Sequence, residues 1–149
     1  MGEWWIDEPR LLGSSNPDDE RLHCLHQRGF SVLVSLLVES EQKPNYSEQT
    51  LAELGFVKYR IPIGDYAVPT LDQILAFVRL ISDPIEPGHI LVHCQGGNGR
   101  TGTMAAAYWV SKGCSPVEAI ARVRLANPLA VETVEQEEVL DAYSAALRR

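Results

Sequence analysis

Short apolar runs alternate with stretches of helical periodicity along the first two thirds of the chain. The run over residues 31–38 is nearly continuous and rich in valine and leucine, which is typical of a parallel strand covered on both faces. Other strands are predicted over residues 4–6, 10–13, 56–61 and 90–92. Helices are predicted between them over residues 16–28, 47–54 and 70–81, the first with Asn16 as its N-cap.

The pattern predicts only helices in the last third of the chain. They are predicted over residues 103–110, 115–126 and 132–147, and a proline-rich break over 84–88 precedes the strand at 90–92. Strands that alternate with helices indicate a parallel sheet, so we predict an α/β fold with a mostly parallel central sheet flanked by helices and a helical C-terminal part. A chain of 149 residues supplies one core, which predicts a single domain over residues 1–149.

Composition narrows the possible partners. Lys and Arg number 13 against 20 Asp and Glu, and the formal net charge of −7 argues against a general affinity for nucleic acid or an anionic membrane. Three irregularly spaced cysteines do not make a disulfide framework, which favours a reducing, cytoplasmic location. His23, Cys24 and His26 have no second cluster at ligand spacing, so we expect no metal and no cofactor. We also expect a monomer.

The most informative stretch covers residues 89–103. A buried strand leads into a glycine-rich turn that opens a helix, and this arrangement binds anions through backbone N–H groups and the helix N-terminus. Cys94 starts the turn and Arg100 ends it, with five residues between them. A loop this short can bring a thiolate and a guanidinium to the same oxyanion, which predicts a loop that binds phosphate and attacks it.

The sequence of this turn resembles a known signature. It reads His93-Cys94-Gln95-Gly96-Gly97-Asn98-Gly99-Arg100-Thr101-Gly102. This is similar to His-Cys-x5-Arg-Ser/Thr-Gly of the cysteine-dependent protein tyrosine phosphatases, and the whole chain resembles a compact dual-specificity phosphatase. The resemblance implies hydrolysis of phosphotyrosine in proteins or peptides through a phosphocysteine intermediate, and it leaves phosphoserine and phosphothreonine open as further substrates.

The residues of the turn have separate expected roles. Cys94 is the expected nucleophile, held as a thiolate by the surrounding N–H donors and Arg100. Arg100 is expected to bind two equatorial phosphate oxygens with its planar fork. The substrate-binding turn consists of Gln95, Gly96, Gly97, Asn98, Gly99 and Arg100, with its glycines permitting positive φ. The resemblance further implies that Thr101 hydrogen-bonds the sulfur, with helix capping as an alternative, and that His93 tunes the thiolate.

Asp65 is the expected general acid. It lies in the segment 61–69, which is too rich in proline and glycine for regular structure, and this segment resembles the acid loop of the family. A turn aspartate bonded to its own backbone is the alternative. Glu39 and Glu41 follow the strand at 31–38, and one of them is a candidate to orient Arg100, with solvated loop carboxylates as the commoner alternative.

Gln136 has two open interpretations. In part of the family a glutamine in this late segment places the hydrolytic water, and Gln136 resembles it. Thr133 to Gln136 is equally a capping box that begins the last helix. Many relatives carry arginine where this chain has Asn127, so the late segment departs from the family pattern.

Two other functions compete with protein dephosphorylation. The same loop could act on phosphoinositides or on the 5′ phosphates of RNA, although Gln95 and Asn98 are neutral where loops for inositol lipids often carry lysine. A non-catalytic adaptor that only binds phosphate is the other alternative. Such an adaptor is expected to lack the cysteine, the arginine or the acid, and this chain keeps all three.

Overall fold

The computed structural model describes residues 2–84 and 87–149, whose strands and helices alternate as the hydrophobic pattern predicts. The strands are β1 (Glu3–Asp7), β2 (Leu11–Ser14), β3 (Phe30–Ser35), β4 (Val57–Arg60) and β5 (His89–His93). The helices are α1 (Asp19–Gln27), α2 (Glu48–Leu54), α3 (Leu71–Ser82), α4 (Gly99–Ser111), α5 (Pro116–Ala126) and α6 (Val134–Leu147).

The five strands form one sheet in the order β1-β2-β5-β3-β4. Only β1 is antiparallel to its neighbour, so the predicted mostly parallel sheet is confirmed. β5 lies at the centre, and its last residue, His93, is level with Ser14 of β2 and Ser35 of β3. The carboxyl ends of the three central strands therefore meet at one edge of the sheet, where ligands bind in open α/β folds.

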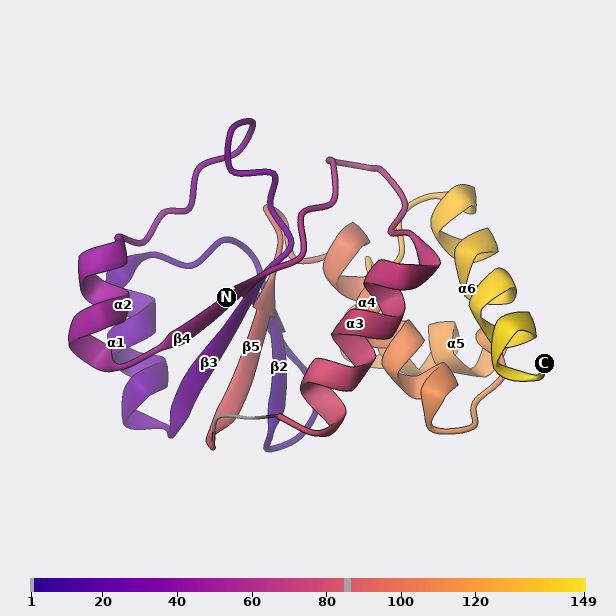
Figure 1. Cartoon of the computed structure of the whole chain (residues 1–149), viewed down its shortest axis with the longest axis horizontal. Helices are drawn as coiled ribbons and strands as arrows, with labels where there is room; N and C mark the ends of the chain where they lie inside the picture. The colour runs from indigo at the N-terminus through magenta and orange to yellow at the C-terminus, as the bar shows by residue number, and fades with distance from the viewer. Residues whose placement is uncertain (1, 85–86) are drawn as a thin grey trace.

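Helices cover both faces of the sheet, which explains why its central strands β3 and β5 are mostly apolar. Figure 1 shows α1 and α2 on one side and α3 to α6 on the other. Successive residues of a strand point to opposite faces. Leu33 accordingly belongs to the smaller core under α1 and α2, whereas Val32 and Val34 belong to the larger core under the other helices.

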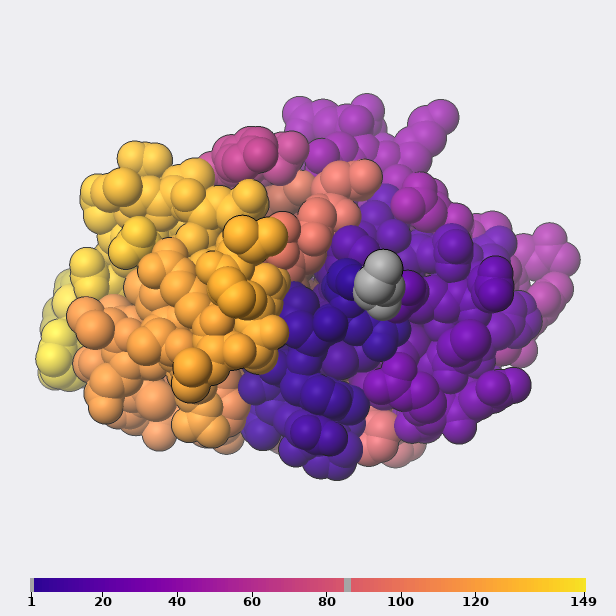
Figure 2. All heavy atoms as spheres, turned by 180° about the vertical axis from the view of Figure 1, so that it is seen from behind, coloured from indigo at the N-terminus to yellow at the C-terminus, as the bar shows by residue number. Residues whose placement is uncertain are grey.

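The helical C-terminal part is also confirmed. α4 is buried along almost its whole length, between the sheet and the helices α3, α5 and α6. Figure 2 shows the orange and yellow C-terminal helices beside the indigo N-terminal segment on the rear face of the molecule. In the part of the chain that the structure describes, no helix has the length and apolar character needed to cross a membrane.

Among the boundaries that differ from the prediction, three bear on the candidate site. β3 ends at Ser35 rather than at residue 38, and the bond from Leu36 N–H to the carbonyl of His93 belongs to the pairing of Ser35 with His93 on β5. α4 starts at Gly99 rather than at residue 103, so Arg100 lies in its first turn. Asp18 rather than Asn16 caps α1. The predicted break over residues 84–88 lies partly outside the described residues.

Candidate active site

Three loops converge at the carboxyl edge of the sheet. The first, residues 36–47, follows β3; the second, residues 61–70, follows β4; and the third, residues 94–98, joins β5 to α4. Figure 1 shows all three at the same end of the sheet, beside the start of α6. Their convergence follows directly from the parallel strand directions. We call residues 94–100 the phosphate loop.

The phosphate loop curls around the sulfur of Cys94. This side chain is 2% exposed, and Gly97 N–H donates to its Sγ at 3.2 Å. Of the three loop glycines only Gly97 has a positive φ, +80°, which corrects the expectation for Gly96 and Gly99. At Gly99 an added β-carbon would meet the carboxylate of Glu132, which is the flexible end of a side chain and can move aside.

Gly97→Ala is expected to destabilise the fold and to disorganise the phosphate loop. An added β-carbon would lie 2.6 Å from the backbone N of Ser15 in addition to the strain of positive φ. We expect a loss of about 3 kcal/mol in the free energy of unfolding, measured by urea denaturation. Gly55→Ala is the matched control, because its φ is +77° and its β-carbon would meet nothing within 4 Å. A loss of about 1 kcal/mol is expected there. Equal losses for the two variants would contradict the close approach.

Arg100 and Asp65 meet at the open side of the loop. The guanidinium is nearly fully buried, and its Nη2 lies 3.1 Å from Oδ1 of Asp65, whose side chain is half exposed. Nη1 donates to the carbonyl of Ile63 at 2.9 Å. Asp65 therefore lies beside the phosphate loop, 35 residues from Arg100 in the chain. Its carboxylate is bonded to side chains of other loops, in contrast to the alternative of a turn aspartate bonded to its own backbone.

The expected carboxylate partner after β3 is not the one observed. Glu39 pairs with Lys58 at 2.8 Å and with Arg60 at 3.4 Å, two basic residues of the edge strand β4. Gln42 occupies the expected place instead, and its Oε1 accepts a hydrogen bond from Arg100 Nη2 at 2.8 Å. Glu39 cannot serve both sites, because Lys58 is itself buried and needs a counter-charge.

His93 is fully buried behind the nucleophile. Its Nδ1 lies 3.0 Å from the carbonyl of Cys94, and its Nε2 lies 2.7 Å from the hydroxyl of Tyr46. The carbonyl can only accept, so Nδ1 carries the proton, and Nε2 accepts from Tyr46. Burial lowers the pKa of His93 to about 4. The ring is therefore neutral at physiological pH.

The neutral His93 is expected to make stability depend on pH. Its pKa is about 4 when folded and 6.5 when unfolded, so the unfolded chain takes up the proton first as the pH falls. The stability that the neutral His93 ring contributes to the fold is complete above pH 6.5 and is lost as the pH falls towards 4. The span of this loss is about 3 kcal/mol in the free energy of unfolding.

Urea denaturation of the wild type and His93→Asn, at several pH values, measures this effect. The free-energy difference between the two proteins should change by about 3 kcal/mol in favour of the variant between pH 7 and pH 4. His26→Asn is the control, because His26 is exposed on α1 and its variant should track the wild type. A constant difference for His93→Asn would show that His93 does not stay neutral in the folded chain.

Thr101 and Gln136 are both fully buried near the phosphate loop. The hydroxyl of Thr101 has no hydrogen-bond partner among the described residues, so neither the bond to sulfur nor the capping role is seen. Gln136 forms the capping box with Thr133, and its Oε1 accepts from Thr133 N–H and Glu132 N–H. Its Nε2 donates to the carbonyl of Ala67 in the loop of Asp65, at 3.3 Å. One N–H of this amide remains for another acceptor.

Three further residues hold the phosphate loop, and sequence patterns did not identify them. Asn16 donates through its backbone N–H to the carbonyl of Gln95 and through Nδ2 to the Gln95 side chain. Asn127 Nδ2 donates to Oδ1 of Asn98 at 2.9 Å, so the residue that departs from the family pattern still contacts the loop. Trp4 Nε1 donates to the carbonyl of Gly97 at 2.8 Å.

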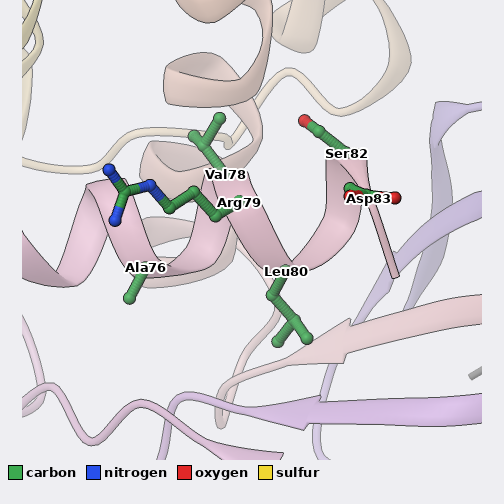
Figure 3. Close-up of a pocket in the computed structure, with 6 residues that line it drawn as sticks. All are labelled: Ala76, Val78, Arg79, Leu80, Ser82 and Asp83. Atoms are coloured by element: carbon green, nitrogen blue, oxygen red, sulfur yellow. The ribbon is translucent and has the colours of Figure 1, made fainter. Parts of the chain in front are cut away.

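A separate hollow of about 700 Å³ lies along the C-terminal half of α3. Figure 3 shows the residues that line it: Ala76, Val78, Arg79, Leu80, Ser82 and Asp83. None of the candidate site residues is among them, so this hollow is not part of the candidate active site.

Comparison with known proteins agrees with this geometry. Residues 9–114 match the family described as "Polymorphic toxin system, DSP-PTPase phosphatase". Protein tyrosine phosphatase domain-containing protein 1 of Danio rerio is 34% identical over 147 residues, which cover 87% of this chain and 20% of that protein. The chain thus spans about a fifth of the length of that curated relative.

Solved structures extend the comparison to the whole fold. Tk-PTP in its active form is 34% identical, with a TM-score of 0.86 and 97% of each chain covered. PTPMT1 in complex with PI(5)P is 22% identical, with a TM-score of 0.82 over 99% of this chain and 97% of that one, and this likeness shows the fold alone. With the phosphate loop at the carboxyl edge of a mostly parallel sheet, the chain belongs to the compact dual-specificity phosphatases of the protein tyrosine phosphatase superfamily.

Proposed function

We propose that this chain is a protein phosphatase that hydrolyses phosphotyrosine, together with phosphoserine and phosphothreonine, through a phosphocysteine intermediate. The observation that carries the proposal is the contact of Asp65 with Arg100 at 3.1 Å, beside the loop that encircles Cys94. A nucleophile, a phosphate-binding cation and an acid are thereby within reach of one phosphate group.

The first half-reaction uses all three groups. The Cys94 thiolate forms a bond to phosphorus while the bond from phosphorus to the leaving oxygen breaks. Arg100 and the N–H groups of the loop bind the equatorial oxygens, whose interactions strengthen as the transferred group becomes planar. Protonated Asp65 donates its proton to the leaving oxygen, which departs as a neutral phenol or alcohol.

The second half-reaction releases the phosphate. Asp65, now a carboxylate, accepts a proton from water as the water oxygen attacks phosphorus and the bond from phosphorus to sulfur breaks. Thr101 and His93 are proposed to support the thiolate as it leaves. The remaining N–H of Gln136 is proposed to place this water, a role that is compatible with its capping box because the box uses only Oε1.

Asp65→Asn is expected to slow the reaction according to the leaving group. Phenyl phosphate, whose leaving group needs a proton, should lose about 10²-fold to 10³-fold in kcat, whereas p-nitrophenyl phosphate should lose far less. Asp72→Asn, an exposed change in the first turn of α3, is the control and should leave both rates unchanged. An identical loss on both substrates would remove Asp65 as the general acid.

Phosphoinositides are the second candidate substrate class, because the same fold holds PI(5)P in PTPMT1. The charge of the chain and of its site favours phosphoproteins over phosphoinositides as substrates. The carboxylate of Glu132 lies against Gly99 of the phosphate loop and Asp65 lies at its open side, so a multiply phosphorylated headgroup would bind near two carboxylates. The net charge of −7 opposes both an anionic membrane and RNA.

A substrate panel separates these functions. Phosphate release should be measured from phosphotyrosyl and phosphothreonyl peptides, phosphoinositide vesicles and triphosphate-ended RNA. We expect the highest kcat/KM on the peptides. Higher efficiency on the vesicles or the RNA would reverse the assignment, and binding of phosphopeptide without turnover would favour the adaptor.

A further inference from the structure

Gln42 is the one side chain in the described residues that hydrogen-bonds both Arg100 and Asp65. Its Oε1 accepts from Nη2 of Arg100 at 2.8 Å, and its Nε2 donates to Oδ2 of Asp65 at 3.1 Å. Nη2 of Arg100 also lies 3.1 Å from Oδ1 of Asp65. The three side chains thus form a closed triangle, each contributed by a different loop of the site.

The loop that carries Gln42 is itself held in place. Backbone N–H groups of Glu41 and Gln42 both donate to the carbonyl of Val38 at 2.9 Å, which makes a tight turn. Asn16 donates through Nδ2 to the carbonyl of Lys43 and also to Gln95 of the phosphate loop. Gln42 is therefore presented from a backbone that is tied to the phosphate loop, and its half-buried side chain has a defined place.

The two oxygens of Asp65 have different partners, and this difference has a chemical consequence. Oδ2 accepts from Gln42, whereas Oδ1 accepts from Arg100. A substrate phosphate competes with Asp65 for the guanidinium, since both are anions. When the phosphate takes Nη2, Oδ1 loses its donor while Oδ2 keeps the amide of Gln42. The carbonyl oxygen of a carboxylic acid is a better acceptor than its hydroxyl oxygen, so the amide donor on Oδ2 favours the proton on Oδ1.

We propose that Gln42 is a positioning residue for the general acid. By donating to Oδ2 it keeps that oxygen as the carbonyl of the neutral acid and directs the protonated Oδ1 towards the phosphate that has replaced it on Arg100. The proton then passes from Oδ1 to the leaving oxygen as the bond to phosphorus breaks, and the resulting carboxylate keeps the Gln42 donor. This inference rests on the proposed function, because it presupposes Asp65 as the acid.

A simpler role for Gln42 would act through Arg100 alone. In that role, Oε1 of Gln42 only orients the guanidinium of Arg100. Loss of this contact would then weaken phosphate binding equally for every leaving group. Gln42→Glu separates the two roles. Glutamate keeps an acceptor for Arg100 but cannot donate to Asp65, and it places a second carboxylate against the acid.

The test compares phenyl phosphate with p-nitrophenyl phosphate for Gln42→Ala and Gln42→Glu. We expect each variant to lose about 10-fold to 100-fold more in kcat on phenyl phosphate, because part of the contribution of the acid is lost. In the Asp65→Asn background neither change should widen this difference further, since the acid is already absent. Gln49→Ala is the matched control: Gln49 is an exposed residue of α2 whose side chain donates, among the described residues, to Glu53 alone, and its loss should leave both rates unchanged.

Equal losses on the two substrates, or a further widening of the difference between them in the Asp65→Asn background, would overturn the role of Gln42. If Gln42→Ala fails to fold, as judged by thermal unfolding, Gln42→Glu decides alone. Failure of the proposed function is a distinct result: Asp65→Asn would then itself show no dependence on the leaving group, whatever the Gln42 variants do.

Discussion

Cys94→Ser is expected to abolish turnover, with kcat for p-nitrophenyl phosphate reduced by at least about 10⁴-fold. A hydroxyl ionises far less readily than a thiol, so serine gives neither a comparable nucleophile nor a comparable leaving group in the second step. The environment of the side chain should otherwise persist. Serine can still accept the hydrogen bond that Gly97 N–H donates to Sγ, and the site is too tightly enclosed for a larger residue.

Binding should survive the loss of turnover. Arg100 and the loop N–H groups remain in Cys94→Ser, so a phosphotyrosyl peptide should still bind, as measured by calorimetry at equilibrium. Cys24→Ser and Cys114→Ser are the controls, because these thiols lie outside the phosphate loop and should leave kcat unchanged. Wild-type rates in Cys94→Ser would exclude the phosphocysteine mechanism, whereas loss of both binding and thermal stability would point to misfolding.

Local patterns predicted the elements that local chemistry determines. The apolar run of β3 and the glycine-rich turn before α4 are visible in the sequence because a doubly covered strand and an anion-binding turn each require particular neighbouring residues. Asp65 was predicted on a different ground, because its proline- and glycine-rich segment, with a helix following it, resembles the acid loop of the family. The structure adds the position of this residue, because Asp65 contacts Arg100 beside the phosphate loop.

The residues that hold the site together have no such local signal. Gln42 lies 58 residues from Arg100, and Trp4 lies 93 residues from Gly97. Asn16 was interpreted as a helix cap because Asn-Pro commonly begins a helix. Its side chain instead bonds two loops that are distant in sequence, and Asp18 supplies the cap. Only the tertiary fold decides between these uses of one asparagine.

The lack of a local signal also explains why the sequence predicted Glu39 or Glu41, and not Gln42, as the partner of Arg100. Proximity of Glu39 to the sheet edge suggested a contact with Arg100, but sequence order does not reveal the buried Lys58 on the neighbouring strand. A buried ammonium group that lacks a counter-charge destabilises the fold, so Glu39 pairs with Lys58 rather than with Arg100. Arg100 is instead hydrogen-bonded by the neutral amide of Gln42. A substrate phosphate therefore has one carboxylate fewer to displace from the guanidinium.

Arg100→Lys is expected to lower kcat/KM for aryl phosphates by about 10³-fold while it preserves the positive charge. The guanidinium is nearly fully buried and donates to Ile63, Gln42 and Asp65 from fixed directions. An ammonium group cannot reach these acceptors and two phosphate oxygens from one plane. Much of the loss should appear in kcat, because bidentate binding strengthens as the phosphoryl group becomes planar.

Arg60→Lys provides the matched control for this change. Arg60 is half exposed and pairs with Glu39 and Glu48, so lysine can replace it and should leave kcat/KM unchanged. Steady-state kinetics with thermal unfolding on both variants separates catalysis from stability. If Arg100→Lys raised KM alone and kept kcat, charge rather than planar geometry would account for phosphate recognition. The expected fall in kcat instead requires the fork that the buried start of α4 holds beside Cys94.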